Sequence, residues 1–370
     1  MTPALSRRRV LGGIAALPAA ALLTAGPSAA AASSLKAAAQ AGHRFFDAAV
    51  RFDQIAADDA LRAAVLRNCT HLTPEIDLKW NALEPRRGEL RLGPADDLAQ
   101  FALRHGLKLR GHTLLWHDGV PGWAAEALAE RPDWTLVRRL FASVIPRFGD
   151  SIEDWEVVNE PIETGYRMDG LRRNPFLAAF GPDYIRRALE EARQFAPNAR
   201  LAINEYGLDY ELPVERDRRY LLLRLIERLR NEGAPLNAIG LQAHLDLAKG
   251  PFDERAFEAF LKELAGFDLQ IAITEFDVME ADRRAPIAVR DRRVADMARR
   301  YLDVALAQKA VAGIATWGLS DRHSWLQEHR PEPREGAADA NRGLPYDGDF
   351  APKPLHRAIR DALRSAPPRL

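Results

Sequence analysis

Short apolar segments alternate with amphipathic segments along most of the chain. The apolar segments resemble buried parallel strands and lie at residues 45–52, 69–80, 107–116, 155–159, 199–206, 237–245, 269–274 and 311–318. Between and after them, apolar positions recur with helical spacing at 58–67, 95–105, 134–148, 183–195, 215–231, 253–264, 289–308 and 354–363. Strands and helices in strict alternation predict an α/β fold, a (β/α)8 TIM barrel that forms a single domain over residues 33–370.

Length and composition agree with one large barrel. Such barrels take about 250 residues and, with insertions, more than about 400, and this chain has 370, of which 47% are apolar. Basic and acidic residues both number 52, so the zero net charge gives no support for nucleic acid or an anionic membrane as partner. The single Cys69 excludes an internal disulfide and a cysteine metal cluster, and we expect it to be a small buried hydrophobe.

The N-terminus has the features of an export signal. Arg7, Arg8 and Arg9 precede an apolar run over residues 10–25 and a tract of small residues at 28–32. The run is too short to span a membrane, and the arginine pair followed by Val10 and Leu11 is similar to a twin-arginine signal. We predict that residues 1–32 direct export to the periplasm or beyond, leaving a mature protein that is a monomer without a membrane segment.

Two predicted strands end in glutamates. The segment DWEVVNEP, residues 154–161, ends in Asn159, Glu160 and Pro161, and Pro161 favours extended geometry at Glu160 and stops the strand. The segment DLQIAITEFDV, residues 268–278, carries Glu275 and Asp277 just after its apolar part. Because active sites of barrels lie at the carboxyl ends of the strands, we expect the two glutamates to face each other across one mouth.

Other polar and aromatic residues follow the same strand ends. A pocket with carboxylates, amides, histidines and tryptophans suits a neutral polyhydroxylated ligand, because sugars offer both hydroxyls and C–H faces. In such a pocket, one glutamate can protonate a glycosidic oxygen while the other attacks the anomeric carbon. His244 and Asp277 are expected neighbours of Glu275 that keep it ionised. The residues concerned are Lys79, Trp80, His112, Trp116, His117, Asn159, Asn204, Tyr206, Gln242, His244, Trp317 and Trp325.

These segments resemble glycoside hydrolase family 10, the retaining endo-β-1,4-xylanases, over residues 36–365. The matching motifs are TPEIDLKWNALEP, LRGHTLLWH, WEVVNEP, INEY, GLQAHL, IAITEFD and TWGLSD..SW, with Lys353-Pro354 near the C-terminus. The resemblance implies that the substrate is xylan or a xylo-oligosaccharide and that no cofactor or metal is needed. It also implies that Glu160 is the acid/base and Glu275 the nucleophile, with Asp277 supporting His244.

The same resemblance assigns the substrate-binding residues. Asn159 would bond the 2-hydroxyl in the −1 subsite, which His112, Gln242 and His244 would line. Glu75 and Lys79 would reach the −2 sugar. Aromatic walls would come from Trp116, Trp317 and Trp325, and Tyr206 would stand on the leaving-group side.

The chain departs from the family pattern at three positions. Ile76 stands where the family has Asn, Gly119 where it has Gln, and Gly207 where it has Asn after the tyrosine. The first two changes remove hydrogen-bonding side chains from the glycone side, so we expect weaker binding there with catalysis intact. The segment 327–342 is longer than in the family and is expected to border the cleft as a loop after the eighth strand.

Three alternatives stay open at this point. The chain could act mainly on short xylo-oligosaccharides or aryl β-xylosides. It could be a carbohydrate-binding barrel without activity, although both glutamates are present. It could also be a metal-dependent hydrolase that uses His112, His117 and His244, but neither an H-x-H nor an H-E-x-x-H spacing occurs.

Overall fold

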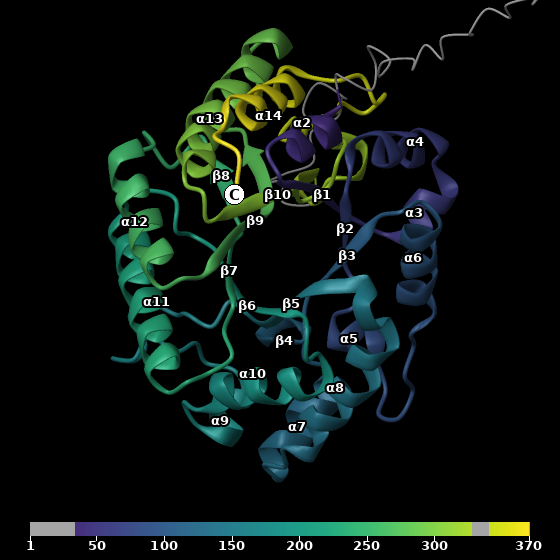
Figure 1. Ribbon diagram of the computed structural model, residues 1–370, viewed down its shortest axis with the longest axis vertical. Coiled ribbons are helices and arrows are strands. Elements are labelled where there is room, and N and C mark those ends of the chain that lie inside the picture. The colour runs from purple at the N-terminus through teal and green to yellow at the C-terminus, as the bar shows by residue number, and fades with distance from the viewer. Residues whose placement is uncertain (1–33, 328–339, 370) are drawn as a thin grey trace, which may run out of the picture.

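The centre of the molecule is a closed barrel of parallel strands. The computed structural model describes residues 34–327 and 340–369. Strand β10 pairs with both β9 and β1, which closes the ring, and Figure 1 shows the helices outside it. This confirms the predicted TIM barrel. The barrel strands are β1 (Phe45–Val50), β2 (His71–Pro74), β3 (Lys108–Gly111), β5 (Ile152–Asn159), β6 (Arg200–Glu205), β7 (Ala238–Leu241), β9 (Gln270–Met279) and β10 (Val311–Thr316).

Two short strands extend the barrel at one end. Strand β4 (Leu115–Trp116) pairs with β5, and β8 (His244–Asp246) pairs with β9. The helices are α2 (Leu35–Ala41), α3 (Phe52–Ala57), α4 (Asp59–Asn68), α5 (Trp80–Leu83), α6 (Gly93–Arg104), α7 (Gly122–Glu130), α8 (Thr135–Phe148), α9 (Pro175–Phe180), α10 (Tyr184–Phe195), α11 (Pro213–Asn231), α12 (Glu254–Gly266), α13 (Ile287–Ala307) and α14 (Pro354–Ser365). Short 3-10 turns lie at η1 (His117–Gly119), η2 (Gly149–Ser151), η3 (Asp321–His323) and η4 (Trp325–Gln327).

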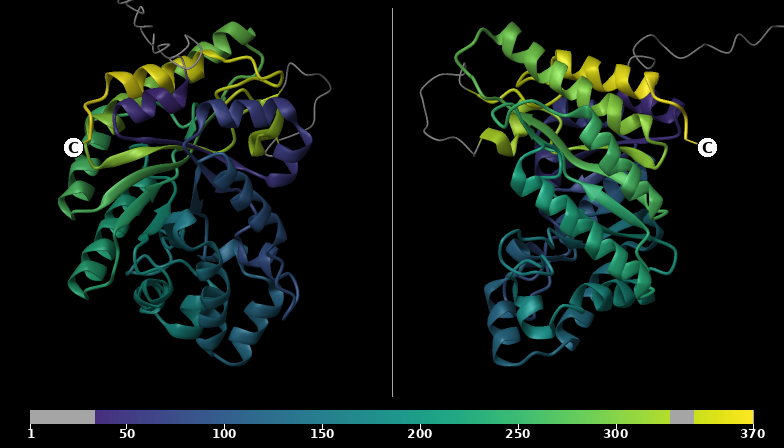
Figure 2. Two further views of the ribbon diagram at one scale, coloured as in Figure 1. Left: turned by 45° about the vertical axis from the view of Figure 1, so that its right-hand side comes forward. Right: turned by 90° about the vertical axis from the view of Figure 1, so that its left-hand side faces the viewer.

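The first and last helices cover the seam where the barrel closes. Helices α2 and α14 lie side by side in both views of Figure 2 and contact each other. Beneath them, the buried Arg44 at the start of β1 donates hydrogen bonds to the carbonyls of Leu306 (2.8 Å) and Pro367 (2.8 Å). One guanidinium thus ties the first strand to the end of α13 and to the C-terminal segment.

The predicted elements are in the right order, but several boundaries differ. Strand β1 stops at Val50, and Phe52 already begins α3. The stretch predicted as one strand over 237–245 is divided into β7 and β8. Strand β9 continues to Met279, so Glu275 and Asp277 lie inside the strand rather than after it, because β8 supplies additional pairing partners. Helices α2, α3, α5, α7 and α9 were not predicted; α5, α7 and α9 lie within loops that follow barrel strands.

Two further expectations concern segments that are only partly described. Residues 1–32, the predicted export signal, lie outside the described residues, as do residues 328–339 of the predicted 327–342 loop. Within the described ranges, no helix has the length and apolar character needed to cross a membrane. Cys69 is fully buried, and burial raises the pKa of its thiol, so it is the small apolar core residue that the sequence predicts.

Close packing against Trp155 requires a glycine in β3. Gly111 lies opposite Trp155 in the register between β3 and β5, and Trp155 is almost fully buried. A methyl group on Gly111 would come closer than 3.0 Å to three atoms of the indole ring. Trp155 also packs against Phe148 of α8, and since protein interiors are densely packed, the indole has no free space to move into.

We therefore expect Gly111→Ala to lower the free energy of unfolding by about 1–3 kcal/mol, the usual cost of overpacking a core. Urea denaturation followed by circular dichroism measures this change. Gly266→Ala in α12 is the control, because a methyl group there meets no atom within 4 Å and should leave stability equal or slightly higher. Equal stability of the two variants would contradict the packing argument.

Candidate active site

Most of the predicted site residues come together in one cleft at the carboxyl ends of the strands. Trp80 is an exception, because it is buried at the start of α5 against Trp123 and Phe176. The cleft has a volume of about 620 Å³. Asp277 is fully buried beneath it and contacts two of its lining residues. All twelve residues predicted to contact the substrate line the cleft: Glu75, Lys79, His112, Trp116, Asn159, Glu160, Tyr206, Gln242, His244, Glu275, Trp317 and Trp325.

Glu160 occupies the turn directly after β5. Its φ is 54°, so the extended geometry that Pro161 was expected to impose is wrong. Two hydrogen bonds hold the backbone in this left-handed conformation. The Glu160 N–H donates to the carbonyl of Asn204 (2.8 Å), and Arg172 Nε donates to the carbonyl of Glu160 (2.7 Å). These tertiary hydrogen bonds outweigh the local preference and direct the carboxylate into the cleft.

The carboxylate of Glu160 is surrounded by neutral amides. Its Oε1 accepts hydrogen bonds from Gln242 Nε2 (3.1 Å) and from Asn159 Nδ2 (3.4 Å). Its Oε2 lies 3.7 Å from Nδ1 of His117. The side chain remains 15% exposed, so a bound molecule can reach it.

Glu275, by contrast, lies among cations and is almost fully buried. Its Oε1 accepts from Asn204 Nδ2 (2.7 Å), and its Oε2 is 3.1 Å from His244 Nε2. Burial raises the pKa of Glu275. The hydrogen bond from His244 and the charges of His112, His244 and Lys79 outweigh this effect, so the pKa lies below its ordinary value. Glu275 is therefore ionised, as the sequence predicts.

The cation beside Glu275 owes its charge to Asp277. Burial alone lowers the pKa of His244, but Asp277, 3.0 Å from its Nδ1, and Glu275 together raise that pKa to about 10. The imidazolium donates one hydrogen bond to each carboxylate. Trp325 Nε1 donates to the second oxygen of Asp277 (2.6 Å), which fixes this carboxylate from its other side.

Amide groups connect the two glutamates across the floor of the cleft. Asn204 donates to Asn159 Oδ1 (3.0 Å) as well as to Glu275, and Thr274 Oγ donates to Asn204 Oδ1 (2.7 Å). The chain Glu160–Asn159–Asn204–Glu275 thus connects strands β5, β6 and β9 and the turn that follows β5. These hydrogen bonds fix which end of each side-chain amide, Asn159 and Asn204, donates and which accepts.

Aromatic and basic groups form the wall around His112 and Lys79. Lys79 Nζ lies 4.6 Å from the ring centroid of Trp116 and 5.6 Å from that of Trp317. The His112 and Trp317 rings meet edge to face at 5.0 Å. Burial lowers the pKa of Lys79, although Glu275 and Glu75 act in the opposite direction.

Sequence reasoning missed the charged pair that orients His112. Glu156 accepts from Arg110 Nη2 (2.9 Å) and lies 2.7 Å from His112 Nδ1, and all three residues are buried in the barrel. The available signal was Arg110 in β3 and Glu156 in β5, two charged residues whose immediate neighbours in each strand are uncharged. Asp118 and Lys249 also line the cleft, and nothing in their sequence context distinguishes them from surface charges.

The three departures from the family pattern occupy different places. Ile76 lines the cleft and is 36% exposed, so an apolar surface replaces an amide there. Gly119 is buried in η1, where a methyl group would lie 3.2 Å from Cε3 of Trp116. Gly207 lines the opposite wall beside Tyr206, with a φ of 61°.

The histidines proposed for a metal-dependent alternative do not gather at one point. Among the described residues, the group whose possible ligand atoms lie within 4.8 Å of one another is His112, Glu156 and Glu275. Each of these already accepts or donates a hydrogen bond to a neighbouring side chain. His117 and His244 are not part of that group.

Comparison with known proteins agrees with this geometry. The model of glycosyl hydrolase family 10 matches residues 34–362. The chain is 32% identical over 265 residues to a beta-1,4-xylanase of Dictyoglomus thermophilum, covering 69% of this chain and 72% of that protein. It is 30% identical over 351 residues to endo-1,4-beta-xylanase 1 of Humicola insolens, covering 93% and 77% of the two chains.

Solved structures show the same similarity in three dimensions. Native xylanase 10B from Thermotoga maritima aligns with a TM-score of 0.78 at 26% identity, covering 89% of this chain and 98% of that one. Xylanase 10B from Thermotoga petrophila, crystallised with xylobiose, aligns with a TM-score of 0.77 at 26% identity, covering 89% and 97%.

The charge on His244 leads to a prediction about Asp277→Asn. Removing this carboxylate should lower the titration midpoint of His244 from about 10 by about one unit or more, since a charge-assisted hydrogen bond contributes about 1.5–3 kcal/mol. Nitrogen-15 NMR of the imidazole ring measures the midpoint. Asp246→Asn is the control. Asp246 lies in β8, as His244 does, but its carboxylate accepts a hydrogen bond from Ala248 N (2.8 Å) instead. A midpoint near 6.5 in the unaltered protein would contradict the assignment.

Proposed function

We propose that this chain, which belongs to glycosyl hydrolase family 10, hydrolyses internal β-1,4-xylosidic bonds of xylan with retention of anomeric configuration. The observation that carries the proposal is the pair Glu160 and Glu275, which share one cleft but have unlike surroundings. A carboxylate among cations suits a nucleophile, and a carboxyl group among neutral amides suits a proton donor. The xylanase names of the relatives and of the solved structures support the choice of substrate.

The reaction divides into two displacements. In the first, the Glu160 carboxyl group gives its proton to the glycosidic oxygen while a Glu275 oxygen attacks the anomeric carbon. The bond to the leaving sugar breaks, and a covalent glycosyl-enzyme forms. In the second, Glu160 takes a proton from water, the water oxygen attacks the same carbon, and Glu275 leaves as a carboxylate.

The surrounding side chains orient the sugar for these steps. Asn159 is fixed by Asn204 and Gln242 (3.3 Å to Asn159 Oδ1), so it presents a defined donor to a sugar hydroxyl. His112 is fixed by Glu156 and the edge of Trp317. We assign His112, Gln242 and His244 to the sugar that is attacked, and Tyr206 to the leaving-group side.

Replacement of either glutamate tests the proposal. Glu160→Ala and Glu275→Ala should each lower kcat on xylan by at least about 10²–10⁴-fold, the usual contribution of a positioned proton donor and a comparable minimum for a nucleophile. Reducing-sugar release measures the rate. Glu163→Ala is the control, since Glu163 lies near Glu160 in the chain but pairs with Arg173 (2.8 Å).

Two outcomes would overturn this proposal. One is substantial residual hydrolysis by either variant. The other is an α anomer as the first product in proton NMR, because double displacement yields the β anomer. Binding of xylan without turnover would favour the carbohydrate-binding barrel, and loss of activity with a chelator would favour the metal-dependent alternative.

A second candidate function keeps the chemistry but changes the preferred chain length. The exposed Ile76 in the cleft, where the family has an amide, favours it, because one hydrogen bond to the glycone is lost. An enzyme with weak glycone binding gains less from long substrates than its relatives do. Short xylo-oligosaccharides or aryl β-xylosides are then hydrolysed almost as well as the polymer.

The variant Ile76→Asn separates these possibilities. Restoring one hydrogen bond should lower KM for xylotetraose by about two- to tenfold, since such a bond contributes about 0.5–1.5 kcal/mol. Rates on xylotetraose, an aryl β-xyloside and xylan measure the effect. Ile287→Asn is the control, as Ile287 is 50% exposed but begins α13, away from the cleft lining. An unchanged KM in Ile76→Asn would show that residue 76 does not contact the glycone.

A further inference from the structure

Two guanidinium groups surround Tyr206 on the wall that we assign to the leaving sugar. The centre of the Arg218 guanidinium lies 4.3 Å from the ring centroid of Tyr206, and that of Arg172 lies 5.4 Å from it. Both also donate to the Tyr206 hydroxyl, Arg172 at 3.0 Å and Arg218 at 3.5 Å. This wall, formed by Arg172, Tyr206, Gly207 and Arg218, is called the arginine wall below.

Neither arginine has a carboxylate partner. Within the described part of the chain, no carboxylate oxygen lies within 4.0 Å of the guanidinium of Arg172 or Arg218, although most other arginines form such pairs. Arg218 is only 8% exposed, and its Nε–H has no hydrogen-bond partner. Buried charges are normally paired, so an unpaired guanidinium at this depth requires an explanation.

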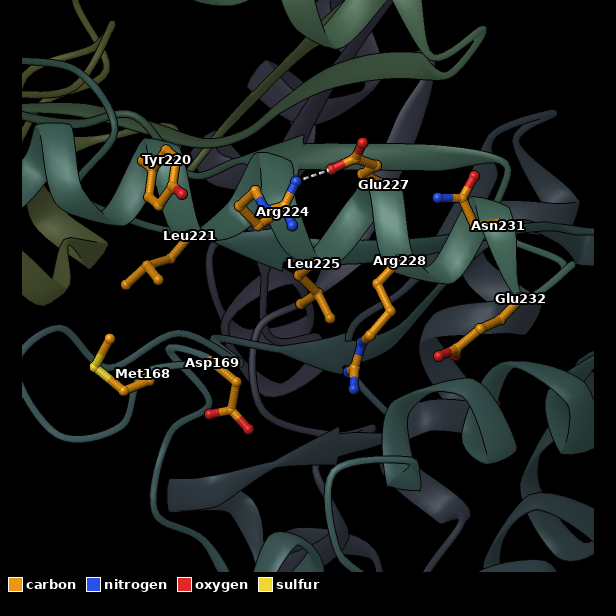
Figure 3. A pocket seen from close by; sticks show the side chains of 10 residues that line it. All are labelled: Met168, Asp169, Tyr220, Leu221, Arg224, Leu225, Glu227, Arg228, Asn231 and Glu232. Atoms are coloured by element: carbon orange, nitrogen blue, oxygen red, sulfur yellow. Dashed lines mark hydrogen bonds and ion pairs between the residues drawn. The ribbon is translucent and has the colours of Figure 1, made fainter.

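The outer part of the same helix shows the ordinary arrangement. In Figure 3, Arg224 of α11 pairs with Glu227 of the next turn. Arg228 donates to the carbonyl of Pro182 (3.2 Å), and Arg219, the neighbour of Arg218, pairs with Glu211. Arg218 differs from these residues because it is buried and its Nε–H has no hydrogen-bond partner among the described residues.

Gly207 gives Arg218 its access to the cleft. A methyl group on Gly207 would come closer than 3.0 Å to Arg218 Nη1, and Gly207 itself lines the cleft. Any larger residue would cover or displace the guanidinium, and its positive φ of 61° also favours glycine. At Gly207, therefore, no side chain separates the cleft from the Arg218 guanidinium behind it.

Nearby acidic groups do not remove the positive charge from this wall. Glu205 is fully buried and its two oxygens accept backbone N–H groups, from Ile162 (2.9 Å) and from Tyr206 (3.0 Å). Burial, with the charge of Glu160, raises the pKa of Glu205 to about 8 despite Arg218, so it is largely neutral at pH 7. Glu215, whose side chain lies near Gly207, is paired with Lys249 at 2.9 Å, so its negative charge is compensated.

We propose that the arginine wall binds the carboxylate of a uronic acid substituent carried by the xylan chain on the leaving-group side of the cleft. A planar guanidinium recognises a carboxylate through paired N–H donors, and Nη1 of Arg218 lies directly behind Gly207 in the cleft lining. Tyr206 offers its ring to the sugar that bears the substituent, while the cations behind it meet the acid. This inference rests on the proposed function and names the substrate class within it.

The test compares one polymer before and after chemical reduction of its carboxyl groups. Glucuronoxylan and carboxyl-reduced glucuronoxylan have the same backbone and substituent size, so the ratio of their kcat/KM values isolates the effect of the charge. We expect a ratio of about five to ten for the unaltered protein, as one charge-assisted bond at a partly solvated site allows. Arg218→Met should bring the ratio close to one, and Arg218→Lys should retain part of it.

Arg219→Met is the matched control, because it removes a guanidinium from the adjacent position of α11 but not from the arginine wall. Its ratio should equal that of the unaltered protein. The ratio of the unaltered protein should also fall by at least half between about 0.01 and 1 M salt, since screening shortens the range of the attraction. This measurement uses only the unaltered protein. It therefore tests the inference even in the case that Arg218→Met does not fold.

The possible outcomes separate this inference from the proposed function. Hydrolysis of both polymers with a ratio near one in the unaltered protein would overturn the inference alone. An unchanged ratio in Arg218→Met would assign Arg218 a purely structural role in supporting Tyr206. Absence of hydrolysis on both polymers, and on linear xylan, would overturn the proposed function itself.

Discussion

The imidazolium of His244, held between Glu275 and Asp277, is the interaction on which the cleft depends. A buried carboxylate without a partner would take up a proton, and Glu275 would then lose its charge. Here the register between β8 and β9 places His244 directly opposite Asp277. Asp277 supports the positive charge of His244, and His244 supports the negative charge of Glu275. The charges of His244 and Glu275 therefore persist in a site where burial alone acts against each of them.

A second charged group supports the other side of the same floor. Arg110, Glu156 and His112 form a buried chain inside the barrel, so the orientation of His112 is set below the cleft rather than within it. The fully buried Asp47 lies nearby, hydrogen-bonded to Thr73 (2.8 Å). Burial, opposed by Arg110, raises the pKa of Asp47 to about 7. Polar groups thus replace the apolar layers of an ordinary barrel core beneath the site, and the rigid strands that carry them fix their positions.

The sequence predicts most of this architecture because barrel strands and helices differ strongly in their apolar pattern. It also predicts the lining of the cleft, because parallel strands bring their carboxyl ends to one face. The backbone of Glu160 could not be predicted, since its left-handed conformation depends on Asn204 and Arg172, which lie 44 and 12 positions away and act through hydrogen bonds. The continuation of β9 through Asp277 was hidden for a similar reason: its pairing partner β8 is too short to be recognised from its own residues. The arginine wall needs both Gly207 and Arg218, and their proximity is a property of the folded chain.

The two sides of the cleft differ in how they can recognise a sugar chain. On the side that we assign to the glycone, Ile76 presents an apolar surface beside Glu75, Lys79 and the tryptophan rings. On the side that we assign to the leaving group, the absence of a side chain at Gly207 uncovers a cation that has no carboxylate partner among the described residues. Interactions with the leaving sugar persist until the glycosidic bond breaks, and so they can assist the first displacement. Loss of binding on one side and gain on the other would leave total affinity similar while moving specificity from chain length to substituent charge.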